Sequence, residues 1–296
     1  MRNEFIQNLI TYRKSNIPIS LIVGDLGYSV VEPFANMFPE SFFNSGVAEQ
    51  NMAGLAAGMA SEGETVFTYS ICNFPTFRCA EQIRNDIDYN SLPVITTSVG
   101  SGVGYGSLGY SHHAIQDIGL MRLFPNTVIS CPGDIVDLDI AMKYFCHHSH
   151  PGYLRLPKAT PKLTLENNGD FSKAFNPGQV LKRRSGKSEH KAVISIGSTL
   201  MQAYEYAVLV DADLYTVPIW NSKNRVEIVE QLLSYDEVYI YEDHLLSGGF
   251  GSYLMESYAL SGYKMPKFTF FCFDEQIIGS VGSENFLNNK FLKKVR

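Results

Sequence analysis

One carboxylate lies where a packed helix would normally carry an apolar side chain. The stretch FFNSGVAEQNMAGLAAGMA covers Phe42 to Ala60, and from Gly46 on it predicts a helix of small apolar residues. Counting back three and four positions from Met52 and Ala53 places Glu49 on the same face. A carboxylate on a buried stripe is costly unless it is paired, hydrogen-bonded or neutralised. Glu49 is therefore either a helix-start residue favoured by the helix dipole, or a group with a chemical task.

A glycine-rich stretch contains the second set of candidate residues. The segment SGVGYGSLGYSHHAIQDIGLMR carries His112 and His113, and a histidine can donate a hydrogen bond or move a proton near neutral pH. Taken alone, His112 could also be a helix-start residue turned to solvent. The letters GYGSLG form a G-x-G-x-x-G pattern, but Asp134 is only loosely placed as the acidic residue that a dinucleotide site requires. A dinucleotide site is thus the weakest interpretation of this stretch.

The elements that must position these residues alternate between short apolar strands and helices. This alternation predicts βαβ units, an α/β fold and mostly parallel sheets flanked by helices. We expect a first domain over 1–160, a connector over 161–187 that could hold short strands, and a second domain over 188–296. The strands expected in the first domain are ISLIVGDLG, TVFTYS, LPVITTSVG, NTVISCPGD and GYLRLP, and its helices are 1–16, 46–61, 77–88, 112–124 and 135–147. The second domain is expected to hold the strands AVISIGS, ADLYTVPIW, EVYIYED and FTFFCF, with helices over 199–210, over 224–233 and after GGFGS.

Composition excludes several classes of protein. The 296 residues are 45% hydrophobic and 18% charged, which is typical of a globular protein with sizeable cores. The net charge of -6 argues against general binding to nucleic acid or to anionic membranes, and no apolar run has the length of a membrane span. The five cysteines are scattered and form no CxxC pair, so we expect reduced thiols, no zinc site and a cytoplasmic location. The N-terminus predicts an amphipathic helix, without the apolar core of a signal peptide.

The segment GVAEQNMAGLAAGMA resembles the pyrimidine-binding domain of the transketolase family of thiamine-diphosphate enzymes. Members of that family carry a strand, a G-x-x-E motif and a small-residue helix in this order. The resemblance implies that Glu49 hydrogen-bonds N1′ of the aminopyrimidine ring, because a carboxyl in a low-dielectric pocket can share a proton with a ring nitrogen. The GDL of Gly24–Leu26 imitates the family's metal motif, but it matches better the strand-end Asp-Leu of the pyrimidine domain. Asp25 and Leu26 would then lie near the cofactor without binding metal.

Two further segments resemble parts of the same cofactor site. FTYSICNFPTFRCAEQIRND is similar to the family segment whose aromatic rings stack on the aminopyrimidine, which implies a cofactor-binding role for Phe74 or Phe77, with Arg78 beside them. Aromatic rings at helical spacing otherwise belong more often to a core. The resemblance also places His112 on the family's histidine that reaches the reacting carbon of the donor substrate. His113 falls in the family's Gln position and is a second substrate-binding candidate.

The resemblance also implies contacts to an anionic substrate group. Arg155 in YLRLPK falls where family members present an Arg to phosphate, which a guanidinium can grip with two hydrogen bonds, and Arg2 is a weaker candidate. A surface salt bridge is the alternative for either residue. The sequence departs from the family at Leu108, where an Asp reads a sugar hydroxyl, and at Gly100, where a His is expected. Both departures predict an unusual substrate.

The second half of the chain resembles the family's C-terminal domain. EVYIYEDHLLSGGFGSYLMES places an acidic strand end before a glycine turn and a helix, so Glu242, Asp243 and His244 are expected on an exposed loop with no catalytic role. The domain that binds diphosphate through Mg2+ has no counterpart here, which predicts a split enzyme. We expect an N-terminal diphosphate-binding partner subunit that supplies the Mg2+ ligands. This chain should form a homodimer within an α2β2 heterotetramer.

Taken together, these features predict a transferase subunit of carbohydrate metabolism that uses thiamine diphosphate and moves a two-carbon ketol unit between sugar phosphates or nucleotide-linked sugars. The β subunit of a 2-oxo-acid dehydrogenase decarboxylase is a related split arrangement and remains an alternative. A non-catalytic scaffold derived from the same fold is a second alternative. A nicotinamide-dinucleotide protein is the third and weakest.

Overall fold

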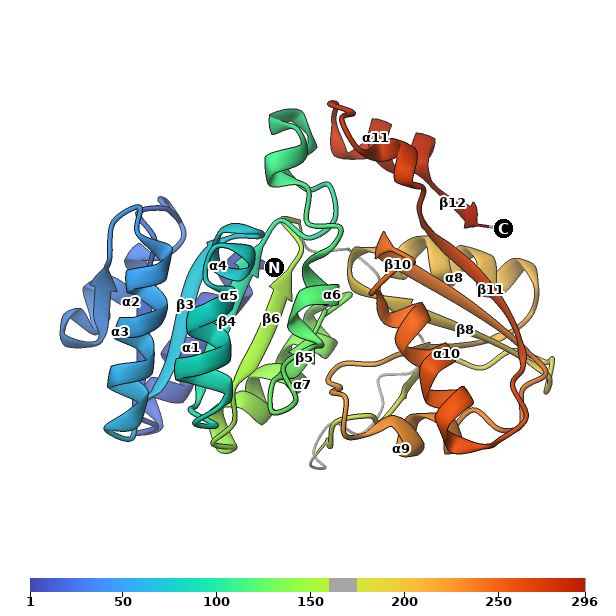
Figure 1. The fold of residues 1–296 in the computed structure, drawn as a ribbon, viewed down its shortest axis with the longest axis horizontal. Helices are drawn as coiled ribbons and strands as arrows, with labels where there is room; N and C mark the ends of the chain where they lie inside the picture. Colours follow the sequence, from blue (N-terminus) through green and yellow to red (C-terminus); the bar gives the residue numbers. More distant parts are fainter. Residues whose placement is uncertain (160–174, 296) are drawn as a thin grey trace.

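Two sheets, each flanked by helices, lie side by side in the computed structural model, which describes residues 1–159 and 175–295 (Figure 1). The first sheet has the strand order β2-β1-β3-β4-β6-β5, and its strands are parallel throughout. Most of its strands are buried along nearly their whole length, as is typical of a parallel sheet covered on both faces. The strands are β1 (Ile19–Val23), β2 (Phe42–Asn44), β3 (Thr65–Ile71), β4 (Val94–Val99), β5 (Val128–Ser130) and β6 (Gly152–Leu156).

Helices cover both faces of this first sheet. On one face, α1 (Arg2–Lys14) and α7 (Ile135–His147) pack with their apolar sides on the strands. On the other face lie α3 (Glu49–Ser61) and the short helix α6 (Asp117–Met121). The buried face of α3 consists mainly of alanines, whose small side chains allow the helix to approach the strands closely, while Gly54 and Gly58 lie on its exposed face. The remaining helical segments are α2 (Glu32–Met37), α4 (Phe74–Phe77), α5 (Ala80–Gln82), the 3-10 turns η1 (Pro39–Ser41), η3 (Gly106–Leu108) and η4 (Tyr110–His112), and the π-helix η2 (Ile83–Asp88).

The second sheet has the order β12-β11-β10-β8-β9-β7, with the inner strands parallel and both edge strands antiparallel. One face is covered by α8 (Leu200–Leu209), and the other by α9 (Arg225–Glu230) and α10 (Phe250–Ser261). The expected fold class, two mostly parallel sheets flanked by helices, is therefore confirmed. The strands are β7 (Leu181–Arg184), β8 (Lys191–Ile196), β9 (Asp213–Thr216), β10 (Glu237–Leu245), β11 (Lys267–Phe273) and β12 (Leu292–Val295), and the short segments are η5 (Gly197–Thr199) and η6 (Glu275–Ile277).

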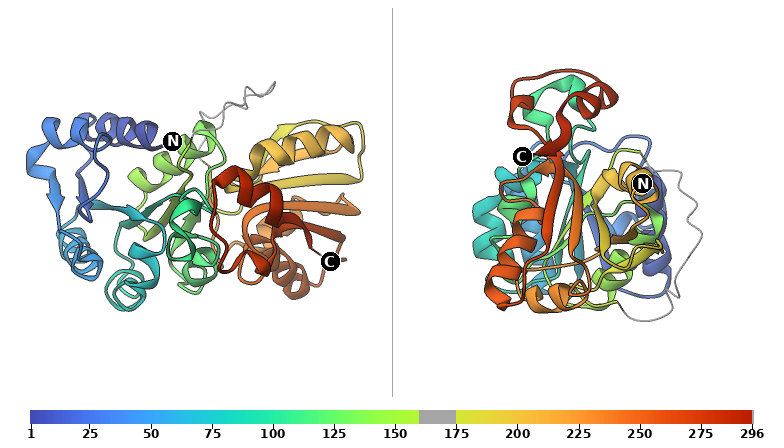
Figure 2. Two further views of the ribbon diagram at one scale, coloured as in Figure 1. Left: turned by 90° about the horizontal axis from the view of Figure 1, so that it is seen from above. Right: turned by 90° about the vertical axis from the view of Figure 1, so that its right-hand side faces the viewer.

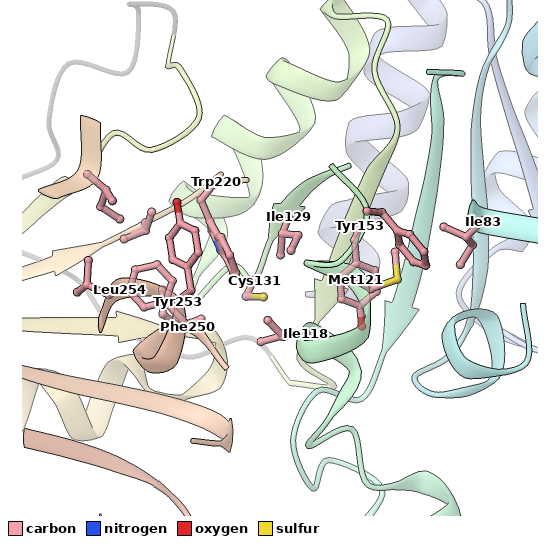
Figure 3. Packing of buried hydrophobic residues seen from close by; sticks show 14 of the residues in the cluster. Ile83, Ile118, Met121, Ile129, Cys131, Tyr153, Trp220, Phe250, Tyr253 and Leu254 are labelled. Atoms are coloured by element: carbon pink, nitrogen blue, oxygen red, sulfur yellow. The ribbon is translucent and has the colours of Figure 1, made fainter. Parts of the chain in front are cut away.

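The two sheets share one apolar core. Ile118, Ile129 and Cys131 of the first half face Trp220 and Phe250 of the second, and all of these side chains are buried (Figure 3). The backbones of Ile129 and Trp220 also pair with each other in an isolated β-bridge. Burial on this scale favours a fixed arrangement of the halves, because opening them would expose the shared apolar surface.

The end of the chain returns to the first half. Helix α11 (Glu284–Phe291) lies beside the loop that follows β4, where Leu287 packs with Val103 and Ile115 (Figures 1 and 2). The backbone N–H of Gly282 also donates to the carbonyl of Gly106, at 3.3 Å. This crossing contact holds the loop between β4 and α6 against the second sheet.

Several predicted element boundaries were wrong. The helix expected from Gly46 begins at Glu49, because Gly46 has a φ of 72° that a helix does not allow. The helix expected over 77–88 is divided into α4, α5 and η2, and the helix expected over 112–124 shrinks to α6. The predicted connector holds β7, which pairs with β9, while residues 160–174 of that connector lie outside the described residues. No pattern in the sequence had indicated α2, β2, α11 or β12.

Within residues 1–159 and 175–295, no helix is long and apolar enough to cross a membrane.

Candidate active site

The candidate site lies at the carboxyl ends of the strands in the first sheet, the edge where open parallel sheets bind ligands. Glu49 is the first residue of α3, and only 2% of its surface is exposed. Its carboxylate pairs with Arg78, whose Nη1 donates to Oε2 at 2.7 Å. The Arg78 side chain is 49% exposed, so this ion pair is buried on the carboxylate side and open to water on the other.

Phe74 and His112 extend this pair into a continuous row of four side chains. The Arg78 guanidinium lies over the Phe74 ring, 4.9 Å from its centroid. The edge of the same ring meets the His112 imidazole at a centroid distance of 5.2 Å and an interplanar angle of 75°. The structure thus brings Glu49, Arg78, Phe74 and His112 together from three loops that follow different strands. Phe77 is not part of the row and is 47% exposed.

The two histidines differ in their surroundings. His112 is half-buried, its Nδ1 lies 2.9 Å from the Ser111 hydroxyl, and burial lowers the pKa of the imidazole from its ordinary value. His113 is buried, and its Nε2 lies 3.4 Å from the carbonyl oxygen of Gly106. Burial is also the main cause that lowers the pKa of His113. Both rings are therefore expected to be neutral near pH 7, each with one nitrogen that donates and one that accepts a hydrogen bond.

Asp25 and Leu26 form the turn at the end of β1, on the same edge of the sheet. Asp25 has a φ of 54° and is exposed, and its backbone N–H donates to Asn44 Oδ1 at 3.1 Å. Its carboxylate accepts hydrogen bonds from the Asn44 amide and from the Tyr28 hydroxyl, both at 3.1 Å. Leu26 is half-buried against the core. These contacts fix the turn but leave the carboxylate accessible.

The residues around Glu49 fit the polar, flat ring of an aminopyrimidine. A Cβ added at Gly24 would lie 3.5 Å from Ser70 Oγ and 3.8 Å from Glu49 Cγ, which are ordinary van der Waals contacts, so Gly24 borders both the hydroxyl and the carboxylate. Ser70 Oγ is buried and has no hydrogen-bond partner among the described residues. A buried hydroxyl without a partner costs free energy that a ligand with a polar edge can recover. Within residues 1–159 and 175–295, no group of three or more His, Cys, Asp or Glu side chains is placed so that it could hold a metal ion.

Arg155 lies away from this edge and is fully buried at the junction of the two halves. Its Nε donates to Asp117 at 2.7 Å, its Nη1 pairs with Asp243, and its Nη2 donates to the carbonyl oxygens of Ala114 and Asp243. This placement does not suit the predicted grip on a substrate phosphate. The reason is local: Arg155 is inside strand β6, whose residues are all buried, and not beyond its end.

The cation beyond the end of that strand is Lys158, which sequence analysis missed. It is exposed, and its Nζ lies 4.9 Å from the centre of the Tyr105 ring. Burial raises the pKa of the Tyr105 phenol, and Arg2 opposes that rise through its charge and a hydrogen bond, so Arg2 approaches the same phenol. The position of Lys158 just past the strand end could have identified it.

The same tyrosine fills the space beside Gly100. A Cβ at Gly100 would lie 2.2 Å from a Tyr105 ring carbon, and Gly100 has a φ of 90°. No side chain fits at this position beside the Tyr105 ring. Leu108, the other position at which the sequence departs from the family, is 56% exposed.

The expectation of an exposed acidic loop at the end of β10 was wrong. Glu242, Asp243 and His244 are all buried. The Glu242 carboxyl accepts the backbone N–H groups of Phe250 and Gly251 at 2.7 and 3.1 Å, at the start of α10, and burial raises its pKa to about 8. Glu242 and Asp243 already lie in the predicted strand, and β10 extends it only through Leu245. They are buried because the start of α10 covers Glu242 and Arg155 of the first half covers Asp243.

Comparisons with known proteins show what the whole chain is similar to. The family described as "Transketolase, pyrimidine binding domain" matches residues 1–162. The chain is 31% identical over 265 residues to a protein of Methanocaldococcus jannaschii named putative transketolase C-terminal section, covering 88% of this chain and 83% of that protein. It is 30% identical over 270 residues to one of the subunits of the apulose-4-phosphate transketolase of Actinobacillus succinogenes, covering 88% and 84%.

Solved structures give the same result. A protein described as a split gene transketolase, inactive beta4 tetramer, superimposes with a TM-score of 0.81 and 27% identity over 99% of this chain and 93% of that one. The transketolase of Campylobacter jejuni shares the fold with a TM-score of 0.74 and 15% identity, and this chain covers 44% of its length. The match to the pyrimidine-binding domain covers more than half of the chain, and the candidate site lies within it. The chain belongs to the transketolase family.

Proposed function

We propose that this chain is the C-terminal subunit of a split, thiamine-diphosphate-dependent enzyme that transfers a two-carbon ketol unit between sugar substrates. The observation that carries the proposal is the row formed by Glu49, Arg78, Phe74 and His112. It joins a buried carboxylate, an aromatic face and a neutral imidazole at the ligand-binding edge of the sheet. The transketolase family is thiamine-diphosphate-dependent, and these residue types suit the aminopyrimidine half of that cofactor.

Each residue of the row has a definite task in this proposal. Glu49 shares a proton with a ring nitrogen of the aminopyrimidine, because its carboxyl is nearly sealed from water. Phe74 offers its ring face for stacking, with Phe77 as the alternative platform, and Arg78 lies between the carboxylate and that face. Asp25 and Leu26 border the same edge from the turn after β1. Once held by these residues, thiamine diphosphate would supply a nucleophilic carbon.

His112 is proposed to hold the donor substrate and to move a proton at its hydroxyl or carbonyl oxygen. Its Nδ1 is near the Ser111 hydroxyl, which leaves Nε2 to face the substrate. Burial lowers the pKa of the imidazole, so the neutral form can act as an acceptor as well as a donor. His113 supports this loop through the Gly106 carbonyl and is a weaker substrate contact.

An anionic group of the substrate is proposed to meet Arg2 and Lys158, not Arg155. Both cations approach Tyr105 near the ends of β4 and β6. A phosphate or nucleotide-linked sugar would supply the negative charge. The occupation of the Gly100 space by Tyr105 and the change to Leu108 support a sugar that differs from the family's usual ones.

The site is proposed to be completed by a separate N-terminal subunit that holds the diphosphate and Mg2+. Large apolar side chains on four loops at the carboxyl edge of the first sheet are exposed, and such a set is typical of a surface that meets a partner. They are Tyr28 at 73%, Val47 at 75%, Phe77 at 47%, Leu108 at 56% and Tyr110 at 41%. The names of the two relatives, one a C-terminal section and the other a single subunit of its enzyme, support the same division.

Two copies of this chain and two of the partner would give an α2β2 assembly with two active sites. The similar solved protein described as an inactive tetramer of beta chains supports the view that this subunit needs its partner for activity. All five cysteines are buried free thiols, which suits a reducing compartment and supports a cytoplasmic location.

The experiment is to mix the purified chain with an N-terminal transketolase subunit from the same organism, add thiamine diphosphate and Mg2+, and assay two-carbon transfer from ketose to aldose phosphates and nucleotide-linked sugars. We expect transfer by the mixture only, reduced about 100-fold or more in Glu49→Gln, because a buried proton-sharing group is lost. Turnover of pyruvate or branched-chain 2-oxo acids without transfer would select the decarboxylase alternative. No effect of Glu49→Gln on any activity of the complex would select a scaffold.

A further inference from the structure

Asn73, between β3 and α4, has a backbone conformation that a side chain rarely adopts. Its φ is 77° and its ψ is -40°, near the rare γ-turn region, whose cost is accepted only where the surroundings require it. Asn is among the residues that tolerate positive φ best, but a glycine would adopt it without strain. The presence of a side chain at this position therefore calls for a reason.

The side-chain amide gives that reason, because it bonds to both neighbours of His112. Nδ2 donates to the carbonyl oxygen of His113 at 2.8 Å and approaches the carbonyl oxygen of Ser111 at 3.3 Å. Oδ1 is buried and has no hydrogen-bond partner among the described residues. An amide turned the other way would bring Oδ1 against two carbonyl oxygens, so the two bonds fix its orientation. The positive φ of Asn73 and its buried Oδ1 without a partner both cost free energy. Both follow from placing Nδ2 between the carbonyl oxygens of Ser111 and His113.

The double contact holds the His112 loop against the next side chain in the row. Phe74 follows Asn73 directly, and its ring meets the His112 imidazole edge to face. The loop from Gly102 to Ala114 is held by 3-10 turns and one isolated bridge, but these bonds lie within the loop and do not join it to the segment that carries Phe74. The contact between the two rings is less directional than a hydrogen bond, so the Asn73 amide is the group that can set their separation.

We propose that Asn73 is a positioning residue of the active site, which sets the distance between His112 and the Phe74–Glu49 row by binding the backbone on both sides of His112. The role rests on the proposed function of that row. It assigns Asn73 no contact with substrate or cofactor. Its loss should therefore change how well His112 meets the substrate, and leave cofactor binding intact.

The variants Asn73→Asp and Asn73→Gly separate this role from general folding. Asp has the same shape and tolerates positive φ, but its carboxylate has no N–H to donate to the two carbonyl oxygens. Gly removes the side chain and relieves the backbone strain. The matched control is Asn90→Asp, because Asn90 also donates from Nδ2 to two carbonyl oxygens, those of Asn85 and Asp86, at 3.2 and 3.0 Å, on the exposed end of η2.

The first readout is hydrogen exchange of the His112 and His113 backbone amides in the chain alone, which requires no activity. Both amides bond within the loop, to Gly109 and Tyr110, and two lost tethers should speed their exchange about tenfold in Asn73→Asp and Asn73→Gly. Asn90→Asp should exchange as the native chain does. Unchanged exchange in both Asn73 variants would overturn the proposal, whatever the enzyme does.

The second readout is the assembled enzyme. We expect kcat to fall about tenfold or more in both Asn73 variants, with thiamine-diphosphate affinity within about twofold of native, and with the Tm of Asn73→Gly equal to or above the native value. A loss of kcat that only follows a lower Tm, or an unchanged kcat, would overturn the proposal. A third outcome combines faster exchange in the Asn73 variants with no ketol transfer by the native assembly. It would count against the proposed function and overturn the catalytic part of the proposal, leaving the Asn73 hydrogen bonds as structural contacts.

Discussion

Two buried carboxylate–arginine clusters in this chain differ in what surrounds the arginine. At the junction of the halves, Arg155, Asp117 and Asp243 are all buried, and Tyr153 and Ser198 donate further hydrogen bonds to the two carboxylates. At the candidate site, Glu49 is nearly as buried as these aspartates, but the cation that meets it, Arg78, is half exposed and rests on Phe74.

The difference separates a closed cluster from one that a ligand can enter. The junction arginine bonds to groups on β10, on the first residue of α6 and on the loop before that helix, so it joins the two halves and has no face left for a ligand. The Arg78 guanidinium makes one ion pair and one ring contact, and water reaches its other side. A buried arginine beside carboxylates is therefore no sign of a phosphate site by itself, and the accessible side of the cation is the better criterion.

The largest effect is expected for Arg155→Met, which removes the cation that lies between Asp117 and Asp243. It should lower the free energy of unfolding by about 3–5 kcal/mol, because two carboxylates lose the charge that compensates them while they stay buried. Urea unfolding followed by circular dichroism measures this loss. Arg84→Met, at an exposed position on η2, is the control and should change little. A loss for Arg155→Met as small as for the control would mean that the junction does not depend on this cluster.

The closed character of the junction also predicts a pH dependence of stability. Burial raises the pKa of Glu242 to about 8, so the folded chain keeps a proton that the unfolded chain has lost above about pH 4.5. Between these two values a rise in pH favours unfolding, and this group contributes a slope of about 1.4 kcal/mol per pH unit.

Urea unfolding of the native chain at several pH values from 5 to 8 measures how the unfolding free energy changes with pH. The Glu242→Gln variant should show a smaller slope, even if its unfolding free energy differs from the native value at every pH. An equal slope in the variant would show that water reaches Glu242 and that the junction is less closed than the bonds to Phe250 and Gly251 imply.

The smallest effect on stability is expected for Arg78→Met. The open side of the ion pair is screened by water, so the variant should lose only about 1 kcal/mol of unfolding free energy. Thermal and urea unfolding, run beside Arg155→Met, measure the ratio of the two losses directly. A loss for Arg78→Met equal to that of Arg155→Met would break the comparison and make the Glu49 pair a structural one.

The sequence allowed a correct prediction of the fold class because short β-rich runs alternate with helical periodicity along the chain. The helix of small residues with Glu49 at its start was recognisable for the same reason, and the glycine and histidine spacing pointed to the His112 loop. These signals are local, since each depends on neighbours within a few positions.

The remaining features depend on contacts between distant segments. Arg155 and Lys158 are three positions apart, and only the end of β6 decides which of them is buried. The exposed loop expected for Glu242 was wrong because the end of β10 is covered by the start of α10 and by Arg155 of the first half, two contacts between distant segments. The π-helix η2 and the two bonds of Asn73 likewise follow from packing, which no spacing in the sequence reveals.

The most direct test of the proposed cofactor site is thiamine-diphosphate binding with Mg2+, measured by titration calorimetry for the chain alone and for its mixture with the N-terminal subunit. We predict binding by the mixture only, weakened about 10- to 100-fold in Glu49→Gln by loss of a buried charged hydrogen bond, and unchanged in the exposed control Glu62→Gln. Equal affinity of the Glu49→Gln and native mixtures, or no binding by the native mixture, would contradict the assignment of Glu49 to a shared cofactor site.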